Sequence, residues 1–157
     1  MKLTKTILAA LAAAVVATGA LAEEMVRSQD PSSVTAFLFE EGIPSKTDVD
    51  SYGDPLVMFR KGDQPYTIWF YGCTENADCG SIRFYSGYET DGAVGIDFAN
   101  KLNLENRFAT ALIDQEDDLV LVMDVLTGAN GMVYSDFRSL LEMFISKIED
   151  AQVQMNN

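Results

Sequence analysis

The chain of 157 residues contains no histidine and only two cysteines. Histidine most often serves as the general base near neutral pH, so its absence excludes Ser-His-Asp and Cys-His catalysis. A zinc site, which takes four ligands largely from histidine and cysteine, is equally unsupported. A Ser-x-x-Lys pair, a G-x-G-x-x-G loop and a phosphate-binding loop are also missing. These absences predict a protein that is not an enzyme and that carries no metal and no cofactor.

Basic residues are scarce as well, with 11 lysines and arginines against 24 aspartates and glutamates. Two of the lysines lie within the first 22 residues, so loss of that segment leaves 9 basic residues, 24 acidic ones and a formal charge of −15. Like charges repel, which argues against nucleic acid and anionic lipid as partners. The charge leaves open the possibility of a basic protein as partner.

The first 22 residues predict a cleavable export signal. Two lysines precede a short apolar run, residues 7–17, and the segment ends in Ala-Leu-Ala at residues 20–22. The run is shorter than the roughly 20 apolar residues of a membrane-spanning helix, so an uncleaved anchor is disfavoured. We expect cleavage between Ala22 and Glu23, and a periplasmic or secreted chain of 135 residues without stable membrane insertion.

The two cysteines lie close together in the exported part, as Cys73-x5-Cys79. An oxidising compartment favours pairing of an even number of cysteines, and the spacing is not the C-x-x-C of redox proteins. A bond across a loop of this length stabilises the fold by about 2 kcal/mol in the loop-entropy model. We therefore predict a structural disulfide between Cys73 and Cys79.

Residues 23–30 are predicted to be a flexible leader and residues 31–152 a single domain. Asp30 and Pro31 favour a helix start, because aspartate caps free amides and proline suits the first turn. Alternating aromatic and branched residues predict strands, and apolar residues at helical spacing from Phe137 to Ile148 predict the last helix. The elements expected before it are helix 31–41, strands 46–50, 56–60, 66–71 and 81–88, helix 93–103, and strands 108–113 and 119–126.

This order, α-βββ(β)-α-ββ-α, predicts an α+β fold. Strand pairs joined by tight turns form an antiparallel sheet, and the helices are expected to pack on one face of it. Trp69, Tyr71 and Tyr85 fall on the face opposite to Ile68. They could line a ligand groove, or helices could cover that face. We favour burial in the core for these aromatic residues.

Acidic residues offer two candidate cation sites. A segment starting at Asp48 has carboxylates at positions one and three of a calcium loop and glycine at position six, but Tyr52 at position five and Phe59 at position twelve break the pattern. It is predicted to be a polar turn between strands. Residues 116–118, Glu-Asp-Asp, fall in a hairpin turn, where acidic runs are usually solvated. A carboxylate-based hydrolase remains a third hypothesis, because 24 acidic residues offer many pairs, and it ranks last because nothing singles out one of them.

Three segments carry a family resemblance: residues 68–73 (IWFYGC), residues 79–84 (CGSIRF) and residues 100–108 (NKLNLENRF). They resemble the YbjN family, described as bacterial sensory transduction regulators, and the likeness extends over residues 31–150. Leu102 stands where an aromatic residue is more common. The residues that we assign to the family motif are Trp69, Phe70, Arg83, Asn100, Asn103, Arg107 and Phe108.

The family is similar in fold to type III secretion chaperones, which are α+β proteins that bind other polypeptides and often dimerise. The resemblance thus implies a protein-binding or regulatory role without an active site, with another protein or a second copy of itself as partner. It implies structural roles for the motif: Asn100 and Asn103 would cap a helix end, and Arg107 would pair with a carboxylate. An exported non-catalytic binding module is the leading hypothesis, and a small-ligand binder using the aromatic sheet face is the alternative.

Overall fold

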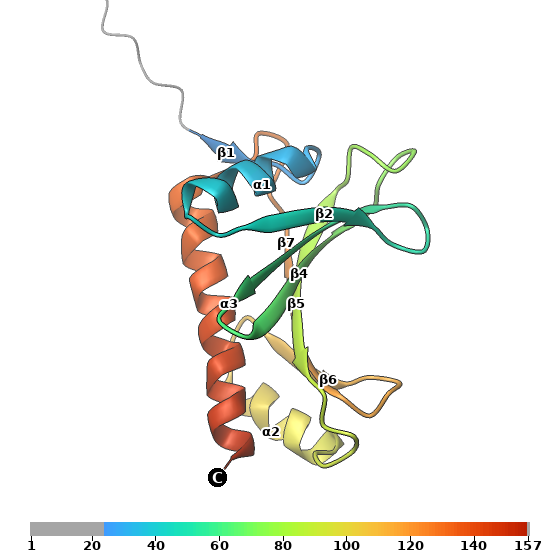
Figure 1. The fold of residues 1–157 in the computed structure, drawn as a ribbon, viewed down its shortest axis with the longest axis vertical. Coiled ribbons are helices and arrows are strands. Elements are labelled where there is room, and N and C mark those ends of the chain that lie inside the picture. The colour runs from blue at the N-terminus through green and yellow to red at the C-terminus, as the bar shows by residue number, and fades with distance from the viewer. Residues whose placement is uncertain (1–23, 157) are drawn as a thin grey trace, which may run out of the picture.

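The structure of the protein, a computed structural model, describes residues 24–156. Within that range three helices pack against a six-stranded antiparallel sheet, and a small two-stranded sheet lies beside them (Figure 1). The predicted α+β class and element order are confirmed. The elements are β1 (Met25–Val26), α1 (Pro31–Glu40), β2 (Ser45–Val49), β3 (Pro55–Lys61), β4 (Gln64–Tyr71), β5 (Ser81–Tyr88), α2 (Ile96–Glu105), β6 (Thr110–Ile113), β7 (Leu119–Val125), β8 (Met132–Val133) and α3 (Tyr134–Met155).

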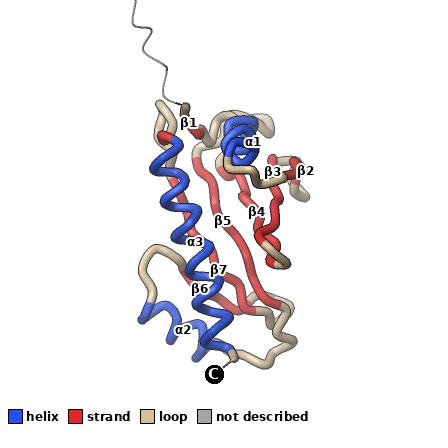
Figure 2. Tube along the Cα trace, turned by 60° about the vertical axis from the view of Figure 1, so that its left-hand side comes forward, coloured by secondary structure: helices blue, strands red, loops and turns tan. Residues whose placement is uncertain are grey.

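The main sheet has the strand order β2-β3-β4-β5-β7-β6, and every neighbouring pair is antiparallel. Ile68 pairs with Phe84, which in turn pairs with Met123, so buried side chains of three strands share one face. Figures 1 and 2 show α3 running along this face, with α1 near one end and α2 near the other. The expected packing of helices on one face therefore holds.

Helix α1 begins and ends where its sequence predicts. The Asp30 carboxylate accepts the backbone N–H of Ser32 at 3.0 Å, and Pro31 opens the first turn. Gly42 follows the helix with a φ of +71°, a conformation that glycine adopts without a steric penalty. The side chains of Phe37 and Leu38 point into the core and are fully buried.

Helix α3 supplies the other half of the core. Its apolar stripe is buried as predicted, except for a half-buried Leu140. The rings of Phe137 and Phe144 lie 5.5 and 5.6 Å from the ring of Phe84 on β5, and Phe137 lies 4.8 Å from Phe37 of α1. Each buried phenylalanine contributes about 2–3 kcal/mol of burial free energy, so this cluster joins both helices to the sheet.

Residues 24–30, the described part of the segment predicted to be a flexible leader, take part in the fold. Met25–Val26 pairs antiparallel with Met132–Val133, and Val26 is fully buried. The backbone N–H of Ser28 donates to the Thr127 hydroxyl at 3.0 Å, 99 residues away. These contacts are non-local, so the short segment carries no periodic pattern by which its order could be recognised.

The predicted export signal, including Ala22 and Glu23, lies outside the described residues. Across residues 24–156 no helix has the length and apolar character needed to cross a membrane.

Candidate functional site

Among the described residues no helix covers one face of the main sheet, and that is the face with the aromatic residues. The interpretation of Trp69, Tyr71 and Tyr85 as helix-covered core is therefore wrong: Trp69 and Tyr85 are half-buried, and Tyr71 is 42 % exposed. Side chains alternate along each strand, so these residues point away from the face on which Ile68, Phe70 and Phe84 are buried. We call this surface the open face and define it by Leu56, Met58, Thr67, Trp69, Tyr71, Arg83, Tyr85, Val122 and Asp124.

Trp69 and Tyr85 form the aromatic centre of the open face. Their rings meet edge to face with centroids 6.3 Å apart. The indole Nε1 of Trp69 is shielded from solvent, and within residues 24–156 it has no hydrogen-bond acceptor. A buried donor without an acceptor costs about 1–3 kcal/mol, so the indole is tolerated here and not optimised for stability.

A charged pair stands beside this centre. Arg83 is the cross-strand neighbour of both Trp69 and Asp124, and its Nε and Nη2 each donate to a different Asp124 carboxylate oxygen at 2.7 Å. The Arg83 hydrogen bond lowers the pKa of Asp124. The Arg83 guanidinium also lies 5.3 Å from the centre of the Tyr71 ring. The family-motif arginine is thereby fixed on the open face by a carboxylate and an aromatic ring.

Acidic residues border the open face at Tyr85. The β6–β7 turn bends over a hollow of about 200 Å³ with Tyr85 in its lining, beside Asp114, Glu116 and Asp118. Burial first, and then the negative charge of these three carboxylates, raises the pKa of Tyr85. Glu116 and Asp117 are exposed, as the sequence predicts for this turn.

Hydrogen bonds hold that turn in shape. Asp114 Oδ1 accepts the backbone N–H groups of Glu116 and Asp118 at 2.9 and 3.0 Å. Asp118 is half-buried, and its Oδ1 accepts the backbone N–H groups of Thr90 and Asp91 at 2.7 and 3.2 Å. Asp118 thus connects the segment after β5 to the β6–β7 turn. The carboxylates of Asp114 and Asp118 therefore stabilise the conformation of this turn.

The segment tested as a calcium loop is a polar turn. Asp50 Oδ1 accepts the backbone N–H groups of Tyr52 and Asp54 at 2.8 and 2.9 Å, which closes the β2–β3 connection. The structure shows no group of three or more His, Cys, Asp or Glu side chains in residues 24–156 that could hold a metal ion.

The predicted disulfide is present between Cys73 and Cys79. It closes the loop between β4 and β5, and Cys79 is fully buried. Asn76, within this loop, donates through Nδ2 to the Tyr52 carbonyl and to the Asp54 carboxylate at 3.0 and 3.1 Å. The bond therefore fixes a loop that also supports the β2–β3 turn.

The remaining motif residues lie away from the open face, and three of them, Asn100, Asn103 and Arg107, differ from expectation. Phe70 is buried in the core, and Asn100 is exposed on α2. Asn103 does not cap the helix: it donates to the Ala111 carbonyl at 2.9 Å and accepts the Ala111 N–H at 2.7 Å. The helix end is instead capped by Asn106, whose Nδ2 donates to the Leu102 carbonyl at 2.9 Å. Asn106 lies beyond the helix end predicted at residue 103, so it was missed because the observed helix continues to Glu105.

Arg107 and Phe108 form their own exposed unit. The Arg107 guanidinium lies 5.0 Å from the centre of the Phe108 ring, and Arg107 takes part in no ion pair found among residues 24–156. The expected ion pair between Arg107 and a carboxylate is therefore not found among the described residues, and Arg107 contacts the Phe108 ring instead. Phe108 is 59 % exposed and has a φ of +74°. Such a φ is unusual for a bulky residue, and it explains why the strand begins at Thr110 and not at residue 108.

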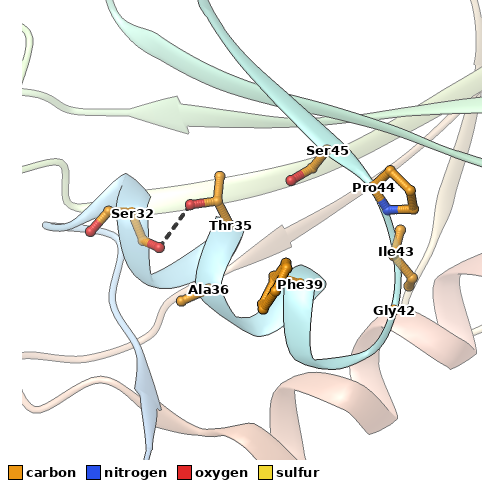
Figure 3. Close-up of a pocket in the computed structure, with 8 residues that line it drawn as sticks. All are labelled: Ser32, Thr35, Ala36, Phe39, Gly42, Ile43, Pro44 and Ser45. Carbon is orange, nitrogen blue, oxygen red and sulfur yellow. Dashed lines mark hydrogen bonds between the residues drawn. The ribbon is translucent and has the colours of Figure 1, made fainter.

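A groove of about 820 Å³ lies beside the start of β2 (Figure 3). Figure 3 shows α1 on one side and, on the other, Pro44 in the α1–β2 connection and Ser45 at the start of β2. Phe39 is 83 % exposed at this groove. We call it the edge groove, and its lining is Ser32, Thr35, Ala36, Phe39, Gly42, Ile43, Pro44 and Ser45. A second hollow of about 540 Å³ shares Pro44 and Ser45 with it.

The family model for YbjN, described as "Putative bacterial sensory transduction regulator", matches residues 30–155. The match spans the three helices and all six strands of the main sheet. No curated protein matches the chain. The chain belongs to the YbjN family.

Proposed function

We propose that the protein is an exported, non-catalytic module of YbjN type that binds another protein through the open face and acts by that binding. The observation that carries the proposal is the uncovered aromatic face of the six-stranded sheet, centred on Trp69 and Tyr85. Tryptophan, tyrosine and arginine are the residues enriched at the centres of protein interfaces, and this face presents all three. The export signal predicted in residues 1–22 and the lack of common catalytic sets support the same role.

The partner is expected to present an apolar centre and a basic border. Trp69 and Tyr85 supply apolar area, and Asp114, Glu116 and Asp118 stand beside Tyr85. The exported chain has a formal charge of −15, which speeds the approach of a basic protein and repels an acidic one. Arg83 and Asp124 neutralise each other, so that pair fixes geometry without adding net charge.

The direct test is site-specific photo-crosslinking in the cells that export the protein. A benzophenone amino acid replaces Tyr71, which is exposed on the open face, and in a matched strain it replaces Leu104, which is 90 % exposed on α2. We expect one polypeptide to be linked at position 71 and not at position 104. It should be lost in Tyr85→Ala, provided that circular dichroism shows the variant folded.

Equal labelling at positions 71 and 104, or none at position 71, contradicts use of the open face. The proposal that the protein is non-catalytic has its own test, because a purified enzyme would turn over a substrate. A specific turnover that disappears when one carboxylate of the hollow is substituted, such as Glu116→Gln, would overturn it.

The hollow over Tyr85 favours a second candidate, a small-ligand binder. Its volume of about 200 Å³ is below the roughly 300–1,000 Å³ of usual ligand sites, so we rank it second. It predicts a thermal shift with a sugar, a lipid or a peptidoglycan fragment, and loss of that shift without unfolding in Tyr85→Ala, which removes the ring that lines the hollow, and in Trp69→Ala, which removes the ring that packs on Tyr85. Absence of any shift across the three ligand classes removes it.

A further inference from the structure

A hollow of about 380 Å³ lies on the helix side of the main sheet, opposite to the open face. The strands β3, β4 and β5 contribute one wall, and α3 contributes the other. Its volume falls within the roughly 300–1,000 Å³ of usual ligand sites. All seven lining residues carry a polar side-chain group, so the hollow offers a ligand mainly hydrogen bonds. We call it the tyrosine hollow, because Tyr66 and Tyr88 belong to its lining.

Tyr66 brings a hydroxyl without a partner to the tyrosine hollow. The residue is only 2 % exposed. Its ring stacks on that of Phe59 with centroids 5.2 Å apart, and it meets the ring of Phe144 edge to face at 6.3 Å. Within residues 24–156 its hydroxyl nevertheless makes no hydrogen bond. A buried hydroxyl without a partner is costly, and a ligand in the hollow can supply the missing hydrogen bond.

The Tyr66 hydroxyl lies toward two other residues of the lining, Tyr88 and Glu149. Burial first, and then the neighbouring Tyr88 phenol and Glu149 carboxylate, raises the pKa of Tyr66. The Tyr88 hydroxyl donates to the Ile148 carbonyl at 2.9 Å, so its oxygen can still accept a hydrogen bond. Two phenol oxygens and one carboxylate therefore converge on the same space.

Gln64 adds an acceptor whose orientation is fixed in advance. Its Nε2 donates to Ser86 Oγ and to the Gly87 carbonyl, both at 2.8 Å. The buried Ser86 hydroxyl is itself held, because it donates to the Pro65 carbonyl at 2.6 Å. The Gln64 Oε1 makes no hydrogen bond among the described residues and stays available to accept. A group that is ordered before binding costs a ligand little affinity.

The charged residues of the lining favour a neutral ligand. Lys61, Asp63 and Glu149 are exposed, and none of them takes part in an ion pair found within residues 24–156. Lys61 attracts an anion that the two carboxylates repel, and the carboxylates attract a cation that Lys61 repels. A neutral molecule meets neither repulsion, and it can accept a hydrogen bond from the ammonium and donate to the carboxylates.

We propose that the tyrosine hollow binds a neutral sugar, whose hydroxyl groups bond to the Tyr66 hydroxyl, to Gln64 Oε1 and to the Glu149 carboxylate. A sugar hydroxyl both donates and accepts, which matches a lining that holds donors and acceptors side by side. Gln152, exposed on α3, adds an amide that can do both as well. The site is separate from the open face, so the inference does not depend on the proposed function.

The test is an NMR titration of the exported chain, with its disulfide intact, using glucose, N-acetylglucosamine and N,N′-diacetylchitobiose as probes. We expect at least one sugar to shift the backbone amide signals of Asp63, Gln64 and Glu149 in a saturable way. The indole signal of Trp69, the single tryptophan of the chain, reports on the open face and should stay in place.

Tyr66→Phe is the decisive variant, because it removes the hydroxyl and keeps the stacked ring. It should weaken sugar binding roughly tenfold, and it should not lower the melting temperature, since the hydroxyl has no partner in the free protein. Tyr134→Phe makes the same change about 22 Å along α3 from Glu149 and should leave binding unchanged. Tyr88→Phe loses the bond to the Ile148 carbonyl and should lower the melting temperature.

Several outcomes would overturn the proposal. One is no saturable shift with any of the three sugars, and another is equal affinity of Tyr66→Phe and the wild-type protein. A fall in melting temperature as large in Tyr66→Phe as in Tyr88→Phe would show that the Tyr66 hydroxyl already has a partner. Tighter binding of glucosamine, which is a cation, than of N-acetylglucosamine would assign the hollow to amines instead of neutral sugars.

Discussion

Asn103 offers the sharpest test of the structural role of the family motif. Its side chain makes two hydrogen bonds to the backbone of Ala111, at 2.9 and 2.7 Å, and Ala111 is 5 % exposed. Each such bond is worth about 1 kcal/mol net, so Asn103→Ala removes about 2 kcal/mol. Alanine forms helix better than asparagine and returns about 0.5 kcal/mol. The expected net loss of unfolding free energy is about 1.5 kcal/mol.

Asn100→Ala is the matched control, because Asn100 is exposed on the same helix and has no side-chain hydrogen bond among the described residues. Asn100→Ala gains the same helix propensity and loses no hydrogen bond, so the unfolding free energies of the two variants should differ by about 2 kcal/mol. For a domain of this size the difference corresponds to roughly 6–10 °C in melting temperature, measured by circular dichroism. Equal stabilities of Asn103→Ala and Asn100→Ala would refute the bridge from α2 to β6. Asn103→Asp, which cannot donate, should fall between them.

Three further predictions concern stability. A Cβ at Gly87 would lie 2.7 Å from the Leu119 carbonyl, so Gly87→Ala should lower the unfolding free energy by about 1–3 kcal/mol in urea titration. Replacing Cys73 and Cys79 together by serine should cost about 2 kcal/mol, and an equal loss on reduction of the wild-type protein checks the cause. Burial raises the pKa of Tyr66 above its ordinary value of about 10 and also raises those of three other tyrosines. The stability that these neutral phenols contribute is complete below about pH 10 and is lost as the pH rises toward their folded pKa. These three tyrosines are Tyr85, Tyr88 and Tyr134. The urea midpoint of unfolding should therefore fall above pH 10, and a midpoint that is unchanged up to pH 12 would contradict the burial of these phenols.

Local patterns predicted most of the secondary structure because each signal acts within a few residues. Asp30 and Pro31 start α1 as expected, and the apolar spacing from Phe137 to Ile148 marks the core side of α3. The cysteine spacing indicated the disulfide, since a C-x5-C pair at the mouth of a hairpin brings both sulfurs together. The boundaries shifted where a single residue changed the backbone, as at Phe108 with its positive φ.

The candidate site was harder to predict because its character depends on which face the helices cover. Alternation placed Trp69 and Tyr85 on one face correctly, but it could not say that this face would be bare. The partners of Asn103 and Arg107 were missed for a related reason. Asparagine caps and arginine ion pairs are the frequent outcomes, whereas Asn103 reaches a strand edge and Arg107 a neighbouring ring.

The sequence by itself determined the α+β class, the order of the elements, the disulfide and the family resemblance, because these depend on residue type and spacing along the chain. The tertiary structure decided which sheet face stays open, which edge α2 protects, and that Met25–Val26 joins the fold beside β8. Those outcomes depend on contacts between residues as far apart as Ser28 and Thr127. Side-chain alternation is symmetric between the two faces of a strand, so only the packing of the helices distinguishes the core from the surface.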